Sequence, residues 1–279
     1  MKKTYSPLIA AILAAVLIIM ISGCTGKVTT EKELKSATEN IQVILQSKLS
    51  NLNNTIAEAA KNISKSGVQG EETLKILNGV CKKYSYLVDC TVSDPYGKII
   101  SAAPDSYRRF EGTDTATTET SKKFFAESAK IRKPMLSTIF RAVEDIDGVV
   151  LVWPVITEQE ELLGYVSALF KPEDLLEGTV SSAAKIRAIK VNVNQVDGTT
   201  IYCSNGTETG KNLFTDERYK AYPDLLTMGE RMKVQKSGSA TYTFPSDKTG
   251  QPVKKTGVWA TIGLHDTEWR ILSMAELGN

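Results

Sequence analysis

Side chains that could carry out chemistry are sparse in this sequence of 279 residues. His265 is the only histidine, so a catalytic triad, a zinc site or a histidine relay would depend on one imidazole. It stands in Leu264-His265-Asp266, where we expect a turn between the last two strands. The chain has no glycine-rich phosphate loop, no Cys-x-x-Cys pair and no Gly-x-Ser-x-Gly elbow. We therefore predict no catalytic residue, no metal site, no cofactor and no enzyme activity.

Two acidic groups have the composition of a cation site but lack its spacing. Glu144, Asp145 and Asp147 do not fit the twelve-residue pattern of an EF-hand calcium loop. The second group, at 158–161, lies between two predicted strands. We interpret both groups as solvated turns.

The N-terminus has the marks of a secretory signal. Two lysines precede an apolar run at 8–21, which ends in Ser22-Gly23-Cys24. The four residues from Ile21 to Cys24 resemble the lipobox of prokaryotic lipoproteins, whose signal is cut before a cysteine that carries a diacylglycerol. The resemblance implies a signal peptide at 1–23, with Cys24 as the lipid anchor and 24–30 as anchor and spacer. The protein would then sit on the extracytoplasmic face of the cell membrane. The alternative is an uncleaved signal anchor in which Cys24 takes no part.

The charge balance of the mature chain argues against one class of partner. Loss of the signal leaves 32 of the 34 basic residues against 32 acidic ones, so no basic surplus is available for phosphates. We therefore predict no nucleic-acid partner.

Three cysteines remain besides Cys24: Cys81, Cys90 and Cys203. Cys81 can pair with Cys90 if the helix before Tyr84 folds back on the next strand. The alternative is three small buried side chains, because a free cysteine packs like a hydrophobe.

Hydrophobic periodicity predicts one long helix near the start of the chain. From Leu34 to Ile63, apolar residues recur three or four positions apart, which indicates a helix of roughly 35 residues and about 50 Å. Such a helix is too long for one small domain and is expected to span two. The same stripe is also compatible with a homodimeric coiled coil. A second helix follows Gly67 and Gly70, and we place both helices within 31–87.

After residue 87 the hydrophobic period changes to two, which is typical of strands. We predict strands at 88–92, 98–102, 135–143, 149–156 and 163–170, and then at 186–195, 199–203, 240–244, 258–264 and 269–274. Helices are expected at 119–131 and 215–232. Because short hairpins join neighbouring strands, parallel sheets are excluded there and the fold class is α+β.

Several short motifs recur in a fixed order along these elements. They are Asp94-Pro95-Tyr96-Gly97, Phe124-Phe125, Asp147-Gly148, Trp153-Pro154-Val155, Gly164 and Leu175-Leu176, and then Asp197-Gly198, Gly210, Gly250, Trp259 and Trp269. Their order and spacing resemble the double Cache (dCache) sensor domain of prokaryotic receptors over nearly all of 30–276. The resemblance implies a long N-terminal helix followed by two PAS-like modules of antiparallel sheet. The membrane-distal module would occupy 88–182 and the membrane-proximal module 183–279.

In this family the distal module binds a small molecule between its sheet and the helix that covers it. Members that bind amino acids hold the ligand carboxylate with an arginine and an aromatic pair, and its amino group with an aspartate on the last strand. By resemblance, Lys122 stands at the arginine position and Phe124 and Phe125 at the aromatic pair. Leu169 stands at the aspartate position, and Thr117 replaces a tyrosine.

These departures change the ligand that the resemblance implies. A lysine supplies a point charge without the fork of an arginine, and Leu169 cannot pair with an ammonium group. Phe140, Ala142 and Glu144 are alternatives for the position on the strand after residue 134. We hypothesise a small carboxylate or partly apolar ligand, held by Lys122 against the phenylalanines at 124 and 140. The alternative is that Lys122 is solvated and the phenylalanines belong to the core.

The sequence therefore predicts a lipid-anchored, extracytoplasmic sensor that passes ligand binding to a membrane partner such as a receptor or a kinase. A homodimer through the long helix is compatible with this interpretation. One alternative is a solute-binding lipoprotein that feeds a transporter, but such proteins need alternating parallel strands and helices, unlike 134–170. Another alternative is a dimeric envelope scaffold without a ligand.

Overall fold

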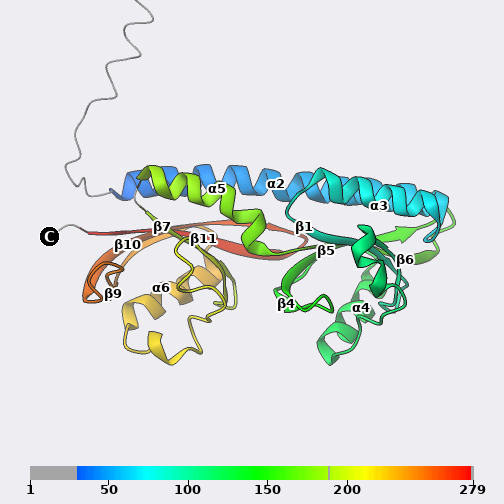
Figure 1. Ribbon diagram of the computed structural model, residues 1–279. Helices are drawn as coiled ribbons and strands as arrows, with labels where there is room; N and C mark the ends of the chain where they lie inside the picture. The colour runs from blue at the N-terminus through cyan, green and yellow to red at the C-terminus, as the bar shows by residue number, and fades with distance from the viewer. Residues whose placement is uncertain (1–29, 188, 278–279) are drawn as a thin grey trace, which may run out of the picture.

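The protein is described by a computed structural model over residues 30–187 and 189–277 (Figure 1). Helix α2, Glu31–Ser66, runs along one side of two antiparallel sheets. It begins with a capping box, in which the Thr30 side chain accepts from the Glu33 amide and the Glu33 carboxylate accepts from the Thr30 amide. It ends at Gly67, whose φ of +94° suits a residue without a side chain.

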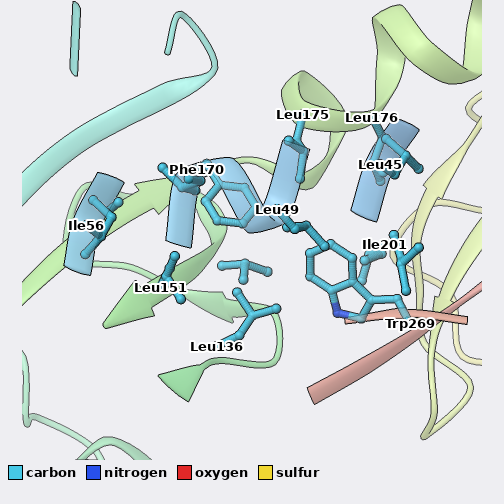
Figure 2. Close-up of a cluster of buried hydrophobic side chains, with 14 of the residues drawn as sticks. Leu45, Leu49, Ile56, Leu136, Leu151, Phe170, Leu175, Leu176, Ile201 and Trp269 are labelled. Atoms are coloured by element: carbon cyan, nitrogen blue, oxygen red, sulfur yellow. The ribbon is translucent and has the colours of Figure 1, made fainter. Parts of the chain in front are cut away.

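The apolar stripe of α2 is buried along its whole length, from Leu34 to Ile63, and contacts strands of both sheets. The predicted long helix that spans two modules is therefore confirmed. Figure 2 shows Ile56 near Phe170 and Leu151, while Leu45 lies near Leu176. Because the chain's own sheets cover this stripe, it is not available for a coiled coil with a second copy.

The first sheet has the strand order β2-β1-β6-β5-β3, with β4 also paired to β5, and every pair is antiparallel. We call it the distal sheet. Its strands are β1 (Leu87–Ser93), β2 (Ile99–Ala103), β3 (Met135–Leu136), β4 (Phe140–Arg141), β5 (Asp147–Ile156) and β6 (Leu162–Phe170). Helix α3 (Glu71–Lys83) packs beside α2 and contacts β1 and β2. The short 3-10 helix η1 spans Asp105–Phe110, and α4 spans Glu119–Ile131.

The predicted strand at 135–143 is broken into β3 and β4. Between them the backbone leaves the ladder, because the amide of Ile139 donates to Oε1 of Gln195 at 2.6 Å instead of to a neighbouring strand. Gln195 belongs to the second sheet, so this break joins the two modules.

The second sheet, which we call the proximal sheet, has the order β8-β7-β11-β10-β9 and is also antiparallel. Its strands are β7 (Lys190–Gln195), β8 (Thr200–Cys203), β9 (Gly238–Pro245), β10 (Pro252–Leu264) and β11 (Thr267–Glu276). Helix α5 (Pro172–Arg187) connects the sheets. The helix predicted at 215–232 is divided into η2 (Glu217–Tyr219) and α6 (Pro223–Val234), because Pro223 starts a new helix.

Each sheet packs one face on α2 and turns the other away from it. In the distal sheet, Cys90, Leu151 and Ala168 belong to the core under α2, and their neighbours along each strand point to the opposite side. Helices α4 and α6 lie on that opposite side of the distal and proximal sheets (Figure 1). The α+β fold with two antiparallel modules is as predicted.

The three cysteines of the described residues are free thiols. Cys81 on α3 lies beside Cys90 on β1, as the fold-back of the helix requires, and the Cys90 thiol lowers the pKa of Cys81. Cys90 and Cys203 are buried, and Cys81 is half-buried. The structure thus agrees with three packed thiols and contains no Cys81–Cys90 disulfide.

Asn53 of α2 joins the two modules. Its Oδ1 accepts a hydrogen bond from Nε1 of Trp153, on β5, at 2.9 Å and contacts Nε2 of His265. His265 stands in the turn between β10 and β11, as predicted, with a φ of +50°. Its ring is half-buried against Trp153 and does not project freely from the surface.

His265 at this junction is expected to make the stability of the fold decrease as the pH falls. Burial lowers the pKa of His265, and the charge of Asp266 opposes that shift. Below about pH 6.5 the unfolded chain therefore binds a proton that the folded protein resists, and stability falls as the pH falls. We expect His265→Asn, which keeps a residue tolerant of positive φ, to reduce this loss between pH 7 and 5. Urea denaturation at both pH values tests this, and an equal loss in both proteins would contradict it.

Candidate functional site

A buried polar surface lies on the face of the distal sheet that points away from α2. Asp89, Thr91 and Ser93 alternate along β1, and the antiparallel register places Asp89 opposite Leu169 and Ser93 opposite Tyr165 on β6. All five side chains are at most 8% exposed. We call these five residues the distal face.

Three polar atoms of the distal face have no hydrogen-bond partner. They are Oδ2 of Asp89, Oγ of Ser93 and the hydroxyl of Tyr165. A buried polar group left unpaired costs about 1–3 kcal/mol, and most such groups in folded proteins are paired. Three of them on one surface indicate a place where the polar atoms of a ligand would complete the hydrogen bonds.

Two carboxyl groups meet at the distal face. Glu144, half-buried in the hairpin between β4 and β5, lies beside Asp89. Burial first, and then the charge of Glu144, raise the pKa of Asp89 well above its usual range. Within the part of the chain that the structure describes, neither carboxyl forms an ion pair with a lysine, arginine or histidine. A bound cation would lower the repulsion between these two acids.

Helix α4 covers this face through its aromatic residues. The Phe125 ring lies 6.1 Å from the Tyr165 ring and 5.6 Å from the Phe124 ring. It also fills the space at Gly97, where an added Cβ would approach the ring to 2.6 Å. The Asp94-Pro95-Tyr96-Gly97 turn therefore needs glycine at its end, both for this contact and for its φ of +99°. The predicted aromatic pair thus lies next to the distal face.

Two other predicted site residues lie away from it. The Lys122 side chain is 58% exposed and pairs with Glu119 at 3.5 Å on the outer side of α4. Thr117 is exposed just before the helix. The structure therefore does not bring Lys122 or Thr117 together with the distal face, and the carboxylate-binding role of Lys122 remains a prediction.

The edge of the face is formed by β4 and β5. Phe140 pairs with Gly148 in the ladder, and an added Cβ at Gly148 would lie 2.8 Å from Leu169. Phe140 is 40% exposed, so it stands at the rim. Of the three alternatives for this segment, Ala142 is buried, while Glu144 is the one that lies beside the carboxyl of the distal face.

Comparison with known proteins agrees with this fold. Residues 47–172 match the family described as HK/GC/Chemotaxis protein-like, sensor domain. An extracellular ligand binding receptor from Desulfohalobium retbaense aligns with a TM-score of 0.72 and 25% identity, over 88% of this chain. The fold is that of a double Cache sensor domain. The chain spans 40% of the length of that receptor.

Other solved sensor and ligand-binding domains share the fold at lower identity. The ligand-binding domain of the Pseudomonas aeruginosa amino acid chemoreceptor PctC, in complex with GABA, has a TM-score of 0.57 and 13% identity, over 88% of this chain and 99% of that one. The extracellular domain of the putative histidine kinase rpHK1S-Z16 has a TM-score of 0.62 and 10% identity, over 88% and 92%. No curated protein matches the sequence. These relatives are sensor and ligand-binding domains, not enzymes. The two antiparallel sheets differ from the parallel α/β lobes that a solute-binding lipoprotein of a transporter would need.

Two negative findings concern only the residues that the structure describes. They contain no helix with the length and hydrophobicity needed to cross a membrane. They also contain no group of three or more histidine, cysteine, aspartate or glutamate side chains that could hold a metal ion.

Asp89 and Tyr165 are functional candidates that sequence reasoning missed. The alternation Val88-Asp89-Cys90-Thr91 indicates that Asp89 faces away from the apolar side of its strand. It does not reveal that Asp89 pairs with Leu169, because β1 and β6 are far apart in the chain. The register thus places an acid, Asp89, on the strand next to Leu169.

The cover of the site is predicted to open more readily than the rest of the fold. Among the described side chains of α4, Ser128 alone is buried, whereas α3, of the same length, buries Thr73, Leu77 and Val80. Local opening is easiest where few apolar contacts hold an element. We expect amide hydrogen exchange to be faster in α4 than in α3, and to slow in α4 when ligand binds. Equal protection of the two helices would contradict this expectation.

Proposed function

We propose that this double Cache domain is an extracytoplasmic sensor that binds a small molecule with a cationic amine on its distal face. The main support is the buried carboxyl of Asp89, which has an oxygen without a hydrogen-bond partner and lies beside Glu144. Within the residues that the structure describes, it forms no ion pair with a basic side chain. An ammonium group supplies both the missing donor and the missing charge. Phe124 and Phe125 add aromatic surface that attracts cations.

The rest of the ligand would contact the remaining groups of the site. The hydroxyls of Ser93 and Tyr165 can accept from or donate to it, and Leu169 and Phe140 offer apolar contact. A ligand carboxylate, if present, would require Lys122 to leave Glu119 and turn toward the site as α4 closes. Related chemoreceptor domains solved in complex with GABA, L-Gln and L-isoleucine support an amine-bearing ligand class.

The location and the relay are part of the same proposal. Cys24 lies outside the described residues, and we infer that it carries the lipid anchor on the extracytoplasmic face. The start of α2 and the end of β11 lie at the same end of the molecule (Figure 1), which supports a membrane-proximal second module. Ligand binding would be relayed to a membrane receptor or kinase. A homodimer would use the outer side of α2, where Val43 and Ile44 are exposed.

A thermal-shift screen of residues 27–279, which include every described element, tests the proposal. The panel contains alkylamines, amino acids, organic acids and purines. A ligand at a hundredfold excess over Kd stabilises the native state by about 2.7 kcal/mol. We expect hits among amines or amino acids. Hits among organic acids alone would instead support the hypothesis that Lys122 binds a ligand carboxylate. No hit at all would favour the alternative of a dimeric envelope scaffold without a ligand.

A further inference from the structure

A cavity lies in the proximal module, between the proximal sheet and α6. The cavity has a volume of about 60 Å³. One water needs about 10–15 Å³ on this measure, so the cavity has room for several waters or for a small organic ion. It lies on the opposite side of the sheet from α2 and does not include any residue of the distal face.

Strand alternation builds the wall of this cavity. Lys190 and Asn192 of β7 point into it, opposite Met274 and Leu272 of β11 in the register. Lys255 lies two strands away on β10. Strands β7 and β11 thus present cavity residues at every second position, while the residues between them pack toward α2.

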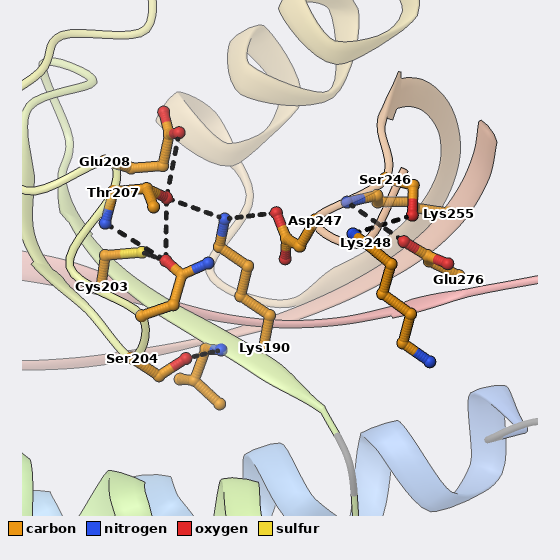
Figure 3. A network of polar contacts seen from close by, with 12 residues as sticks. Lys190, Cys203, Ser204, Thr207, Glu208, Ser246, Asp247, Lys248, Lys255 and Glu276 are labelled. Atoms are coloured by element: carbon orange, nitrogen blue, oxygen red, sulfur yellow. Dashed lines mark hydrogen bonds and ion pairs between the residues drawn. The ribbon is translucent and has the colours of Figure 1, made fainter. Parts of the chain in front are cut away.

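One half-buried and one buried ammonium group line the cavity, and each lies far from its nearest carboxylate. The Lys190 side chain is 13% exposed, and its Nζ lies between Thr207 and Asp247, 3.4 Å from Oγ1 and 3.5 Å from Oδ1 (Figure 3). The Lys255 side chain is 5% exposed, and its Nζ is 3.9 Å from Oε1 of Glu276. All three distances exceed the roughly 2.7–2.9 Å of a charge-assisted hydrogen bond.

The other cations of the wall are paired closely. Arg270 lies 2.9 Å from Glu268, and Lys233 lies 2.8 Å from Glu230. Burial lowers the pKa of Lys255, and repulsion from Lys190 adds to that effect, although Asp247, Glu276 and Glu208, which also lines the cavity, oppose it. The two under-compensated lysines are therefore the place where an anion would gain most.

A polar group and an apolar wall define the rest of the cavity. Asn192 is 8% exposed, and its Oδ1 has no partner. Because the two ends of an amide are interchangeable by rotation, Asn192 can offer a ligand oxygen its NH₂ group instead. Met228 and Met232 of α6, with Phe244 of β9, line the other side. Methionines adapt their shape to an aliphatic chain.

We propose that this proximal cavity binds a short-chain aliphatic carboxylate, with its anionic group between Lys190 and Lys255 and its alkyl tail against Met228 and Met232. The site is separate from the amine site proposed for the distal face, so each can exist without the other. A double Cache domain with both sites would respond to two classes of small molecule.

Butyrate is the probe for the test, with butylamine and butanol as matched compounds that lack the anion. In calorimetry with residues 27–279, we expect butyrate to be the only one of the three compounds that binds at this site. We expect Lys255→Met to weaken butyrate binding by more than about tenfold. The control Lys248→Met changes an exposed lysine in the neighbouring turn and is expected to leave the affinity unchanged. Lys190→Met serves as a second variant if Lys255→Met does not fold.

A spectroscopic readout locates the ligand. With ¹³C-methyl methionine labelling, butyrate is expected to shift the resonances that Met228→Leu and Met232→Leu remove. Asp89→Asn is expected to leave butyrate binding intact, which separates this site from the distal face. The proposal is overturned if butyrate does not bind, if the lysine variants bind it as well as the wild type, or if Asp89→Asn abolishes its binding.

Discussion

Ile56→Ala is expected to lower the free energy of unfolding by about 2–5 kcal/mol. Ile56 is fully buried on α2 and lies near Leu151 and Phe170 of the distal sheet (Figure 2). Because the stripe of α2 also belongs to the core under the proximal sheet, the loss is expected in one cooperative transition for both modules. Urea unfolding followed by circular dichroism and by tryptophan fluorescence measures both quantities. Trp153 reports on the distal sheet, and Trp259 and Trp269 report on the proximal sheet.

Ile44→Ala is the matched control, since it removes the same atoms from the same helix. Ile44 is 49% exposed on the outer side of α2, so the change is expected to cost less than about 0.5 kcal/mol. Equal costs at positions 44 and 56 would show that the stripe does not carry the core. Two separate unfolding transitions would contradict the shared core of the modules.

Asp89→Asn is expected to weaken binding of an amine ligand by more than about a hundredfold. It removes the charge that faces the ammonium group, and loss of one partner of a buried charged pair costs about 2–5 kcal/mol. Side-chain size hardly changes, and the asparagine NH₂ can donate to Glu144. Calorimetric titration with the best amine from the screen measures the effect. Unchanged affinity would place the amine elsewhere.

The same substitution is expected to stabilise the protein without ligand at neutral pH. The pKa of Asp89 is raised in the folded state, so above about pH 4 the unfolded chain loses a proton that the folded protein retains. The free energy of unfolding that Asp89 contributes is therefore fully present at low pH. It is lost as the pH rises toward the pKa of Asp89 in the folded protein. Asparagine removes that loss. Urea unfolding at pH 5 and pH 8 tests the sign, with the exposed Asp105→Asn as the control.

Sequence reasoning succeeded where a periodic pattern extends over many residues. The stripe from Leu34 to Ile63 repeats often enough to define both the helix and its buried side. The alternation of strands after residue 87 likewise predicted two antiparallel modules. It failed at 135–143, where a hydrogen bond from Ile139 to Gln195 of the other module interrupts the strand. Such a contact between distant residues leaves no local pattern.

The site was predictable only in part for the same reason. The Phe125 ring of the predicted aromatic pair lies 6.1 Å from the Tyr165 ring, and the ligand-binding role of the pair stays a prediction. Lys122 shares that helix but points to solvent, and helical spacing over so short a segment did not decide which side it occupies. Asp89 became visible only when the register placed it opposite Leu169. The two lysines of the proximal cavity likewise come from separate strands.

The most direct test is a crystal structure of residues 27–279 with the tightest amine or amino acid from the screen. The ligand nitrogen is predicted to lie about 3 Å from Oδ2 of Asp89, with the Phe125 ring against the ligand and the Tyr165 hydroxyl paired. That result would establish the distal face as the sensory site. Ligand bound elsewhere, with the Asp89 carboxyl unchanged, would contradict the account.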